Sequence, residues 1–156
     1  MTTSRKRSLL VLSTLVGLLA MAGQVQPATS AVSCHNINAK GLGQDLGGGM
    51  TQAQILGGGL LEGTTKGSFT ITGFSGSVAS IAGTVEFTTN RSTLTVTVAG
   101  TFDVASGAFS ASGPVTAATG KLAGATGELT LSGVEDLSDG SFTEDVSGNI
   151  CADLTP

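Results

Sequence analysis

The sequence predicts an all-β protein, a single eight-stranded antiparallel β-barrel that follows a cleaved signal peptide. From Thr64 onward, apolar and polar residues alternate with a period of two, which is the pattern of a half-buried strand. Glycines interrupt the chain too often for a helical period to persist. A glycine-bracketed heptapeptide also recurs along this region, as expected for short strands joined by turns.

The first 31 residues have the features of a secretory signal peptide. Arg5, Lys6 and Arg7 precede the apolar run SLLVLSTLVGLLAMA, which is shorter than the ~20 residues that a membrane-spanning helix needs. A membrane anchor is the rival interpretation of this run. We place cleavage after Ala31, with Ala22 as the alternative, and we expect a secreted protein, extracellular or periplasmic, with no membrane attachment after cleavage.

The charge of the processed chain excludes one class of partner. Removing the signal peptide leaves four basic residues against eleven acidic ones, a net charge of −7. An acidic chain repels phosphate backbones, so nucleic acid is not an expected partner. The remaining chain of about 125 residues is long enough for one domain.

Two cysteines, Cys34 and Cys151, lie near the two ends of the processed chain. In an exported protein such a pair predicts one disulfide, whereas free or metal-binding thiols are the alternative. His35 is the only histidine, and we interpret it as a polar neighbour of the disulfide rather than a catalytic base.

Residues 32–62 form a glycine-rich segment with two triple-glycine runs. Ordering so much glycine costs backbone entropy, so this segment is predicted to be irregular and partly mobile, with a short helical turn at MTQAQIL. Residues 63–156 are predicted to form the barrel domain. The expected strands are 64–72, 77–89, 92–99, 101–105, 107–113, 119–123, 127–134 and 141–151.

The heptapeptide occurs as GSFTITG from Gly67, GAFSASG from Gly107 and GELTLSG from Gly127, with a looser copy, GSFTEDVSG, from Gly140. We interpret each copy as one strand bracketed by two glycine turns. Closing such strands into a barrel removes the exposed edges that would otherwise aggregate.

The segment TGKLAGATGELTLSG resembles a hairpin of the allene oxide cyclase barrel-like and dirigent-like superfamily. The matching residues are Gly120, Lys121, Leu122, Gly124, Ala125 and Gly127. The stretch GLLEGTTKGSFTITG and the ending SGNICADL are similar to the small secreted bacterial members, so the resemblance covers roughly residues 59–154.

This resemblance implies an exported eight-stranded barrel of calycin or allene oxide cyclase type, often a homo-oligomer, with an apolar cavity. It carries over no catalytic residue. The chain has no tyrosine or tryptophan, and Arg91 is its only arginine after processing, so the polar and aromatic residues of the plant enzymes have no counterparts.

Two carboxylates, Glu86 in TVEFT and Asp103 in TFDVA, lie opposite the apolar face of their predicted strands. If that apolar face fills the barrel, both carboxylates are solvated. If it points outward at an oligomer interface, Glu86 and Asp103 line the interior and become candidate acid, base or ligand-binding groups.

A second acidic group contains Glu135, Asp136, Asp139, Glu144 and Asp145. Their spacing matches no EF-hand, and we interpret them as the solvated flanks of a hairpin turn at Asp139 and Gly140 rather than a calcium site. No phosphate-binding loop is present either, so neither a metal nor a cofactor is predicted.

Three classes of function follow. We favour a non-catalytic exported barrel that binds a small apolar ligand or self-assembles. The alternatives are an isomerase or cyclisation-guiding enzyme on the same scaffold, and a structural or adhesive surface protein with threonine- and serine-rich faces. The shortage of histidine, tyrosine, tryptophan and arginine argues against acid–base chemistry.

Overall fold

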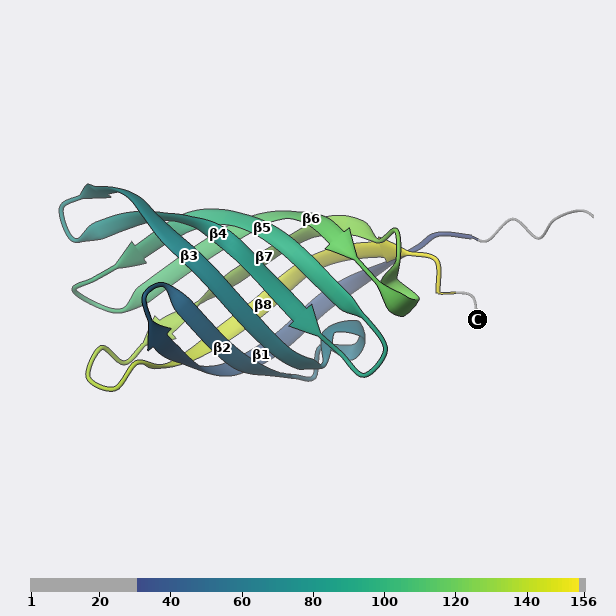
Figure 1. The fold of residues 1–156 in the computed structure, drawn as a ribbon, viewed down its shortest axis with the longest axis horizontal. Coiled ribbons are helices and arrows are strands. Elements are labelled where there is room, and N and C mark those ends of the chain that lie inside the picture. Colours follow the sequence, from purple (N-terminus) through teal and green to yellow (C-terminus); the bar gives the residue numbers. More distant parts are fainter. Residues whose placement is uncertain (1–30, 155–156) are drawn as a thin grey trace, which may run out of the picture.

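The computed structural model describes residues 31–154, which form one closed barrel of eight antiparallel strands (Figure 1). Each strand pairs with the next along the chain, and the last pairs with the first, so the prediction of an eight-stranded antiparallel barrel is confirmed. The strands are β1 (Ser33–Gly47), β2 (Met50–Leu56), β3 (Gly63–Ser75), β4 (Val78–Thr88), β5 (Thr93–Asp103), β6 (Ala108–Ala118), β7 (Thr126–Glu135) and β8 (Ser141–Ala152). Two short 3-10 helices, η1 (Gly59–Leu61) and η2 (Gly120–Leu122), lie in the connections. The predicted signal peptide lies, apart from Ala31, outside the described residues.

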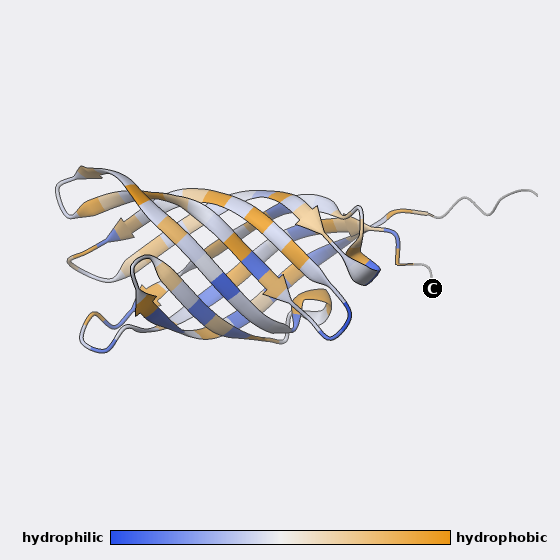
Figure 2. Cartoon of the chain, in the orientation of Figure 1, coloured by the Kyte–Doolittle hydropathy of each residue, from blue (hydrophilic) through white to orange (hydrophobic). Residues whose placement is uncertain are grey.

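Side chains alternate between the interior and the outer surface along the strands. Apolar and polar residues follow one another along the ribbon as differently coloured bands (Figure 2). On β4, for example, Val85 and Phe87 are buried while Glu86 between them is exposed. The period-two pattern therefore marks the interior face, as a pleated strand requires. No helix in the described part of the chain is long and apolar enough to cross a bilayer.

The segment predicted to be irregular, residues 32–62, is instead the start of the barrel. Most of it forms β1 and β2, and MTQAQIL is strand rather than a helical turn. The first triple-glycine run supplies the turn between these strands, where Gly48 and Gly49 have φ of 64° and 79°. Positive φ at both central residues is what a tight two-residue hairpin turn needs.

The glycines of the heptapeptide do not bracket strands in the way we predicted. In GELTLSG, both Gly127 and Gly133 lie within β7, which runs past them at each end. A Cβ on Gly133 would overlap the carbonyl oxygen of Thr143 on β8. These glycines therefore let neighbouring backbones approach closely inside the sheet. Among the glycines that begin or end the copies, only Gly107 and Gly140 lie in turns between strands.

Two further strand assignments are wrong for related reasons. Residues 92–99 and 101–105 were predicted as two strands, but β5 continues through Gly100, where a Cβ would overlap the backbone of β6 at Ser110. Residues 119–123 were predicted as a strand and instead form a loop that contains η2. In both places we took a glycine as the end of a strand. Gly100 lies inside β5, and Gly120 belongs to a connection rather than to a strand.

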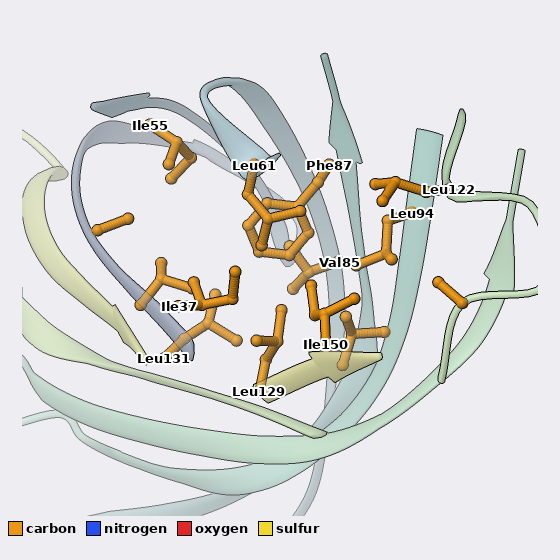
Figure 3. Close-up of a cluster of buried hydrophobic side chains, with 14 of the residues drawn as sticks. Ile37, Ile55, Leu61, Val85, Phe87, Leu94, Leu122, Leu129, Leu131 and Ile150 are labelled. Atoms are coloured by element: carbon orange, nitrogen blue, oxygen red, sulfur yellow. The ribbon is translucent and has the colours of Figure 1, made fainter. Parts of the chain in front are cut away.

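The half of the barrel nearest the described chain ends is solidly filled (Figure 3). Phe87, Leu94, Leu129 and Ile150 have no exposed surface and pack in one cluster. Leu61 of η1 and Leu122 of η2 join this cluster from the two connections at that end. The backbone N–H of Leu122 donates a hydrogen bond of 3.2 Å to the Ser92 hydroxyl oxygen, which holds η2 against the β4–β5 loop.

The predicted disulfide between Cys34 and Cys151 is confirmed. These cysteines are directly opposite each other in the ladder between β1 and β8, the pair that closes the barrel. Their neighbours Ile150 and Ala152 are buried, so the disulfide lies on the outer face of the sheet, at the filled end. It covalently joins the first and last strands where they complete the sheet.

Candidate ligand-binding cavity

The opposite half of the barrel is hollow. A cavity of about 250 Å³ lies between the strand ends that lead into the β1–β2, β3–β4, β5–β6 and β7–β8 turns, and we call this the open end (left in Figure 1). This volume lies just below the ~300–1,000 Å³ typical of ligand cavities in proteins, so the space suits a ligand at the small end of that range. The filled half lies beneath it and closes the other end.

Four phenylalanines supply the whole of the aromatic lining: Phe69 of β3, Phe102 of β5, Phe109 of β6 and Phe142 of β8. The rings of Phe109 and Phe142 pack edge to face, with centroids 5.8 Å apart and planes at 89°. This arrangement suits the charge distribution of aromatic rings. Only two other phenylalanines exist in the chain, so its aromatic residues are concentrated around the hollow.

One carboxyl group, that of Glu144 on β8, is buried in this lining. Its residue is 6% exposed. Its partners on the two neighbouring strands are both glycines, Gly41 of β1 and Gly133 of β7. A Cβ on Gly41 would overlap the Glu144 side chain. Gly41 thus provides the room in which this side chain lies, while the absence of a side chain at Gly133 lets the backbones of β7 and β8 approach closely beside it.

The environment of Glu144 disfavours its charge. Burial raises the pKa of Glu144 to about 7, because an ionised carboxylate loses its hydration there. No hydrogen bond or ion pair to this carboxyl group occurs within residues 31–154. No side-chain oxygen of residues 31–154 is both sealed from solvent and without a hydrogen-bond partner, so the carboxyl group of Glu144 reaches the space of the cavity, where no basic residue or hydrogen-bond donor of the described chain pairs with it.

Two further carboxylates line the cavity, Asp45 on β1 and Glu135 on β7. Burial, with the nearby negative charge of Asp45, raises the pKa of Glu135. No lysine, arginine or histidine among the described residues lines the same space. The polar side chains of the lining are consequently three acidic residues and the threonines Thr51, Thr65 and Thr70.

The two carboxylates that we singled out from the sequence do not meet in this cavity. Glu86 is exposed on the outer face of β4. Asp103 lies at the end of β5, where it accepts a hydrogen bond of 2.9 Å from the Ala105 N–H. That bond, followed by one from the Ser77 hydroxyl, lowers the pKa of Asp103. Both residues are on the solvated side, as expected if the apolar face fills the interior.

Apart from Glu135 and Glu144, the other sequence candidates lie on the surface. The His35 ring nitrogen Nε2 lies 2.8 Å from the Ser33 hydroxyl, beside the disulfide. Asp145 points outward and pairs with Lys40. Asp136 accepts hydrogen bonds from Ser138, from its hydroxyl and its N–H, which lower the pKa of Asp136. The acidic segment is thus divided, with Glu144 inside the barrel and its neighbour outside.

Sequence reasoning missed Glu144, although the repeat contains a signal for it. In the first three heptapeptides, the fifth residue is apolar: Ile71, Ala111 and Leu131. All three line the cavity. In the fourth copy the equivalent residue is Glu144, in phase with Phe142 and Val146. Residues 141–151 were predicted as a strand, but counting Glu144 among the solvated flanks of the turn at Asp139 and Gly140 hid the substitution of a carboxyl group for an apolar interior side chain.

Comparison of the chain with protein-family models, with curated proteins and with solved structures found no match.

Proposed function

We propose that this protein is an exported binding barrel that holds a small apolar molecule in its open half. The observation that carries the proposal is the cavity itself, a hollow lined by four phenylalanines above a solidly packed base. Natural cores are packed without sizeable voids, so an apolar space of this size in a small barrel favours a ligand.

Export is part of the same proposal, and the disulfide supports it. Disulfides such as Cys34–Cys151 persist in oxidising compartments, which include the extracellular space and the bacterial periplasm. The resemblance of residues 120–127 to the allene oxide cyclase and dirigent superfamily agrees with an exported barrel. We retain kinship with that superfamily as a proposal.

An isomerase or cyclisation-guiding activity would have to rest on a different residue from those we first considered. Glu86 and Asp103 are outside the cavity, which leaves Glu144 as the one deeply buried carboxyl group within it. Binding requires only the cavity and its lining, so we favour it over catalysis.

The proposal is tested with Nile red, a neutral apolar dye whose fluorescence rises in apolar surroundings. The oxidised protein from residue 32 onward is expected to bind the dye saturably. Thr51→Trp places a large ring at a lining position and should weaken binding by at least about tenfold, since it removes much of the space. Gln52→Trp, at the exposed neighbouring position on β2, is the matched control and should bind as the parent does.

Circular dichroism and the melting temperature establish that both variants are folded. Equal dye binding by a folded Thr51→Trp protein would show that the dye binds elsewhere and would contradict the proposal. A parent protein that binds neither the dye nor other apolar compounds would favour the structural or adhesive alternative.

A further inference from the structure

The cavity contains a feature that apolar binding alone does not require, which is the carboxyl group of Glu144: the residue is 6% exposed, and its carboxyl group faces the cavity with no partner from the described chain. A leucine at position 144 would contact an apolar ligand equally well. Leu131, the fifth residue of the third heptapeptide copy, lines the same cavity in this way. The cost of burying a carboxyl group is offset when a ligand supplies the missing partner. We therefore asked which ligand chemistry fits the surroundings of this group.

We propose that the ligand is a small apolar amine, whose ammonium group pairs with the carboxylate of Glu144 while its apolar part lies among the phenylalanine rings. This inference rests on the proposed binding function and specifies the chemical class of its ligand.

The charges around Glu144 favour a cation. The facing groups that titrate are Asp45 from β1 and Glu135 from β7, and both are acidic. The remaining neighbours of Glu144 in the ladders are Gly41 and Gly133, which have no side chain. An anionic ligand such as a fatty acid would meet three carboxylates and no compensating positive group from the described residues.

The aromatic lining favours the same choice. Phenylalanine rings attract cations through their negative faces, and the attraction strengthens where water is excluded. Phe142 is two residues from Glu144 on the same interior face of β8, and Phe109 packs edge to face against it. An ammonium group near Glu144 would therefore have aromatic neighbours as well as a carboxylate, while a neutral hydroxyl would gain much less from either.

The distribution of charge over the barrel is consistent with this assignment. Of the four basic residues in the described chain, Arg91 and Lys121 lie in connections at the filled end, and Lys40 pairs with Asp145 on the outside. Lys66 lies on the exposed face of β3. The charged side chains at the open end are all acidic among the described residues, so the electrostatic field there attracts a cationic ligand toward the cavity.

The test compares three compounds that share one skeleton: 3-phenylpropylamine, 3-phenylpropan-1-ol and 3-phenylpropanoic acid. Calorimetric titration of the oxidised protein at pH 7.5 is expected to show the amine binding at least about tenfold more tightly than the alcohol, with the acid weakest. Glu144→Gln keeps the shape of the side chain and removes its charge. In this variant the amine should lose its advantage, while the alcohol binds as before.

Glu128→Gln, which removes an exposed carboxylate from the outer face of β7, is the control and should leave the order of the three compounds unchanged. If the amine and alcohol bind the parent equally, or if the preference for amine survives in a folded Glu144→Gln protein, the inference is wrong and the proposed apolar binding function stands. If no compound of the three binds and Nile red also fails to bind, both proposals fall. Dye binding without any preference among the three compounds overturns only the assignment of the amine.

Discussion

Glu144 has a carboxyl group in a mainly apolar cavity, with glycines on both neighbouring strands in place of partners. In water a carboxylate is stabilised by hydration, and burial among the mainly apolar side chains of the cavity removes part of that hydration. The protein responds by favouring the neutral form, which is the reason for the pKa of about 7. This balance makes the stability of the empty barrel depend on pH.

The direction of that dependence follows from the two states of the residue. The pKa of Glu144 in the folded protein, about 7, lies above its ordinary value of 4.5, so the folded state holds the proton more tightly than the unfolded chain. The stabilisation is complete below about pH 4.5 and is lost as the pH rises to about 7. At 1.36 kcal/mol per pKa unit, the free energy of unfolding should fall by up to about 3 kcal/mol over this range.

Urea denaturation at pH 5 and pH 8 measures this change, with Glu144→Gln as the comparison. Burial also raises the pKa of Glu135, so its contribution has the same direction and remains in the variant. The difference between the two proteins isolates the share of Glu144. Equal pH dependence in parent and variant would show that the carboxyl group is well hydrated in solution.

At the level of the strand, Gly127 is the clearest test of why the heptapeptide contains glycine. Its φ is +144°, which side chains rarely adopt, and a Cβ there would overlap the carbonyl oxygen of Asn149 on β8. Gly127→Val should lower the free energy of unfolding by about 1–3 kcal/mol, because backbone must shift to accept the side chain. Chemical denaturation gives the value.

The matched control is Glu128→Val, one position along β7 and exposed on the outer face. Valine suits a strand, so this change should alter stability by no more than about 0.5 kcal/mol. If Gly127→Val were as stable as Glu128→Val, close approach of β7 and β8 would not be the reason for the glycine.

The elements that could be predicted from sequence are those with apolar interior residues in alternation. Residues 64–72 and 127–134 were predicted as strands and lie within β3 and β7, since Phe69, Leu129 and Leu131 mark the interior face. β4 and β8 follow the same rule. Local alternation is enough in these cases, because the residues that face the interior are themselves apolar.

β1 could not be recognised in this way. Two of its interior positions are Gly41 and Gly43, whose space is occupied by Glu144 and Phe142 from β8 about a hundred residues later in the chain. The apolar side chain that completes the pattern is on another strand, so no local window contains it. An apolar cavity was expected from the resemblance, but the place of Glu144 in it was missed for the same reason, since glycine on β1 and Glu144 on β8 become meaningful only when the two strands pair.

At the scale of the whole molecule, the barrel divides into a filled half and a hollow half. The filled half contains the main apolar cluster, both 3-10 helices and the disulfide. Around the open end, each of the four hairpin connections carries an exposed large apolar side chain at or beside it: Leu46, Phe74, Val104 and Leu137. The packed core and the proposed binding cavity therefore lie at opposite ends, so we expect that stability can be changed without changing the proposed binding.

The disulfide allows this separation to be tested. Cys34 and Cys151 are 117 residues apart in sequence, and a loop of that length constrains the unfolded chain by up to about 5 kcal/mol in the chain-entropy account. The double variant Cys34→Ser, Cys151→Ser should lower the free energy of unfolding by an amount approaching that value, measured by urea denaturation. The ladder between β1 and β8 remains to hold the barrel closed.

Binding should respond differently from stability in the same variant. The cysteines lie at the filled end, and neither lines the cavity, so Nile red affinity under conditions in which the double variant is folded should stay within about twofold of the parent. Reduction of the parent protein should reproduce both effects. A large loss of dye affinity in the folded variant would contradict this expectation. It would mean that the disulfide at the filled end changes the geometry of the cavity through the ladder between β1 and β8, so that the two halves of the barrel are coupled.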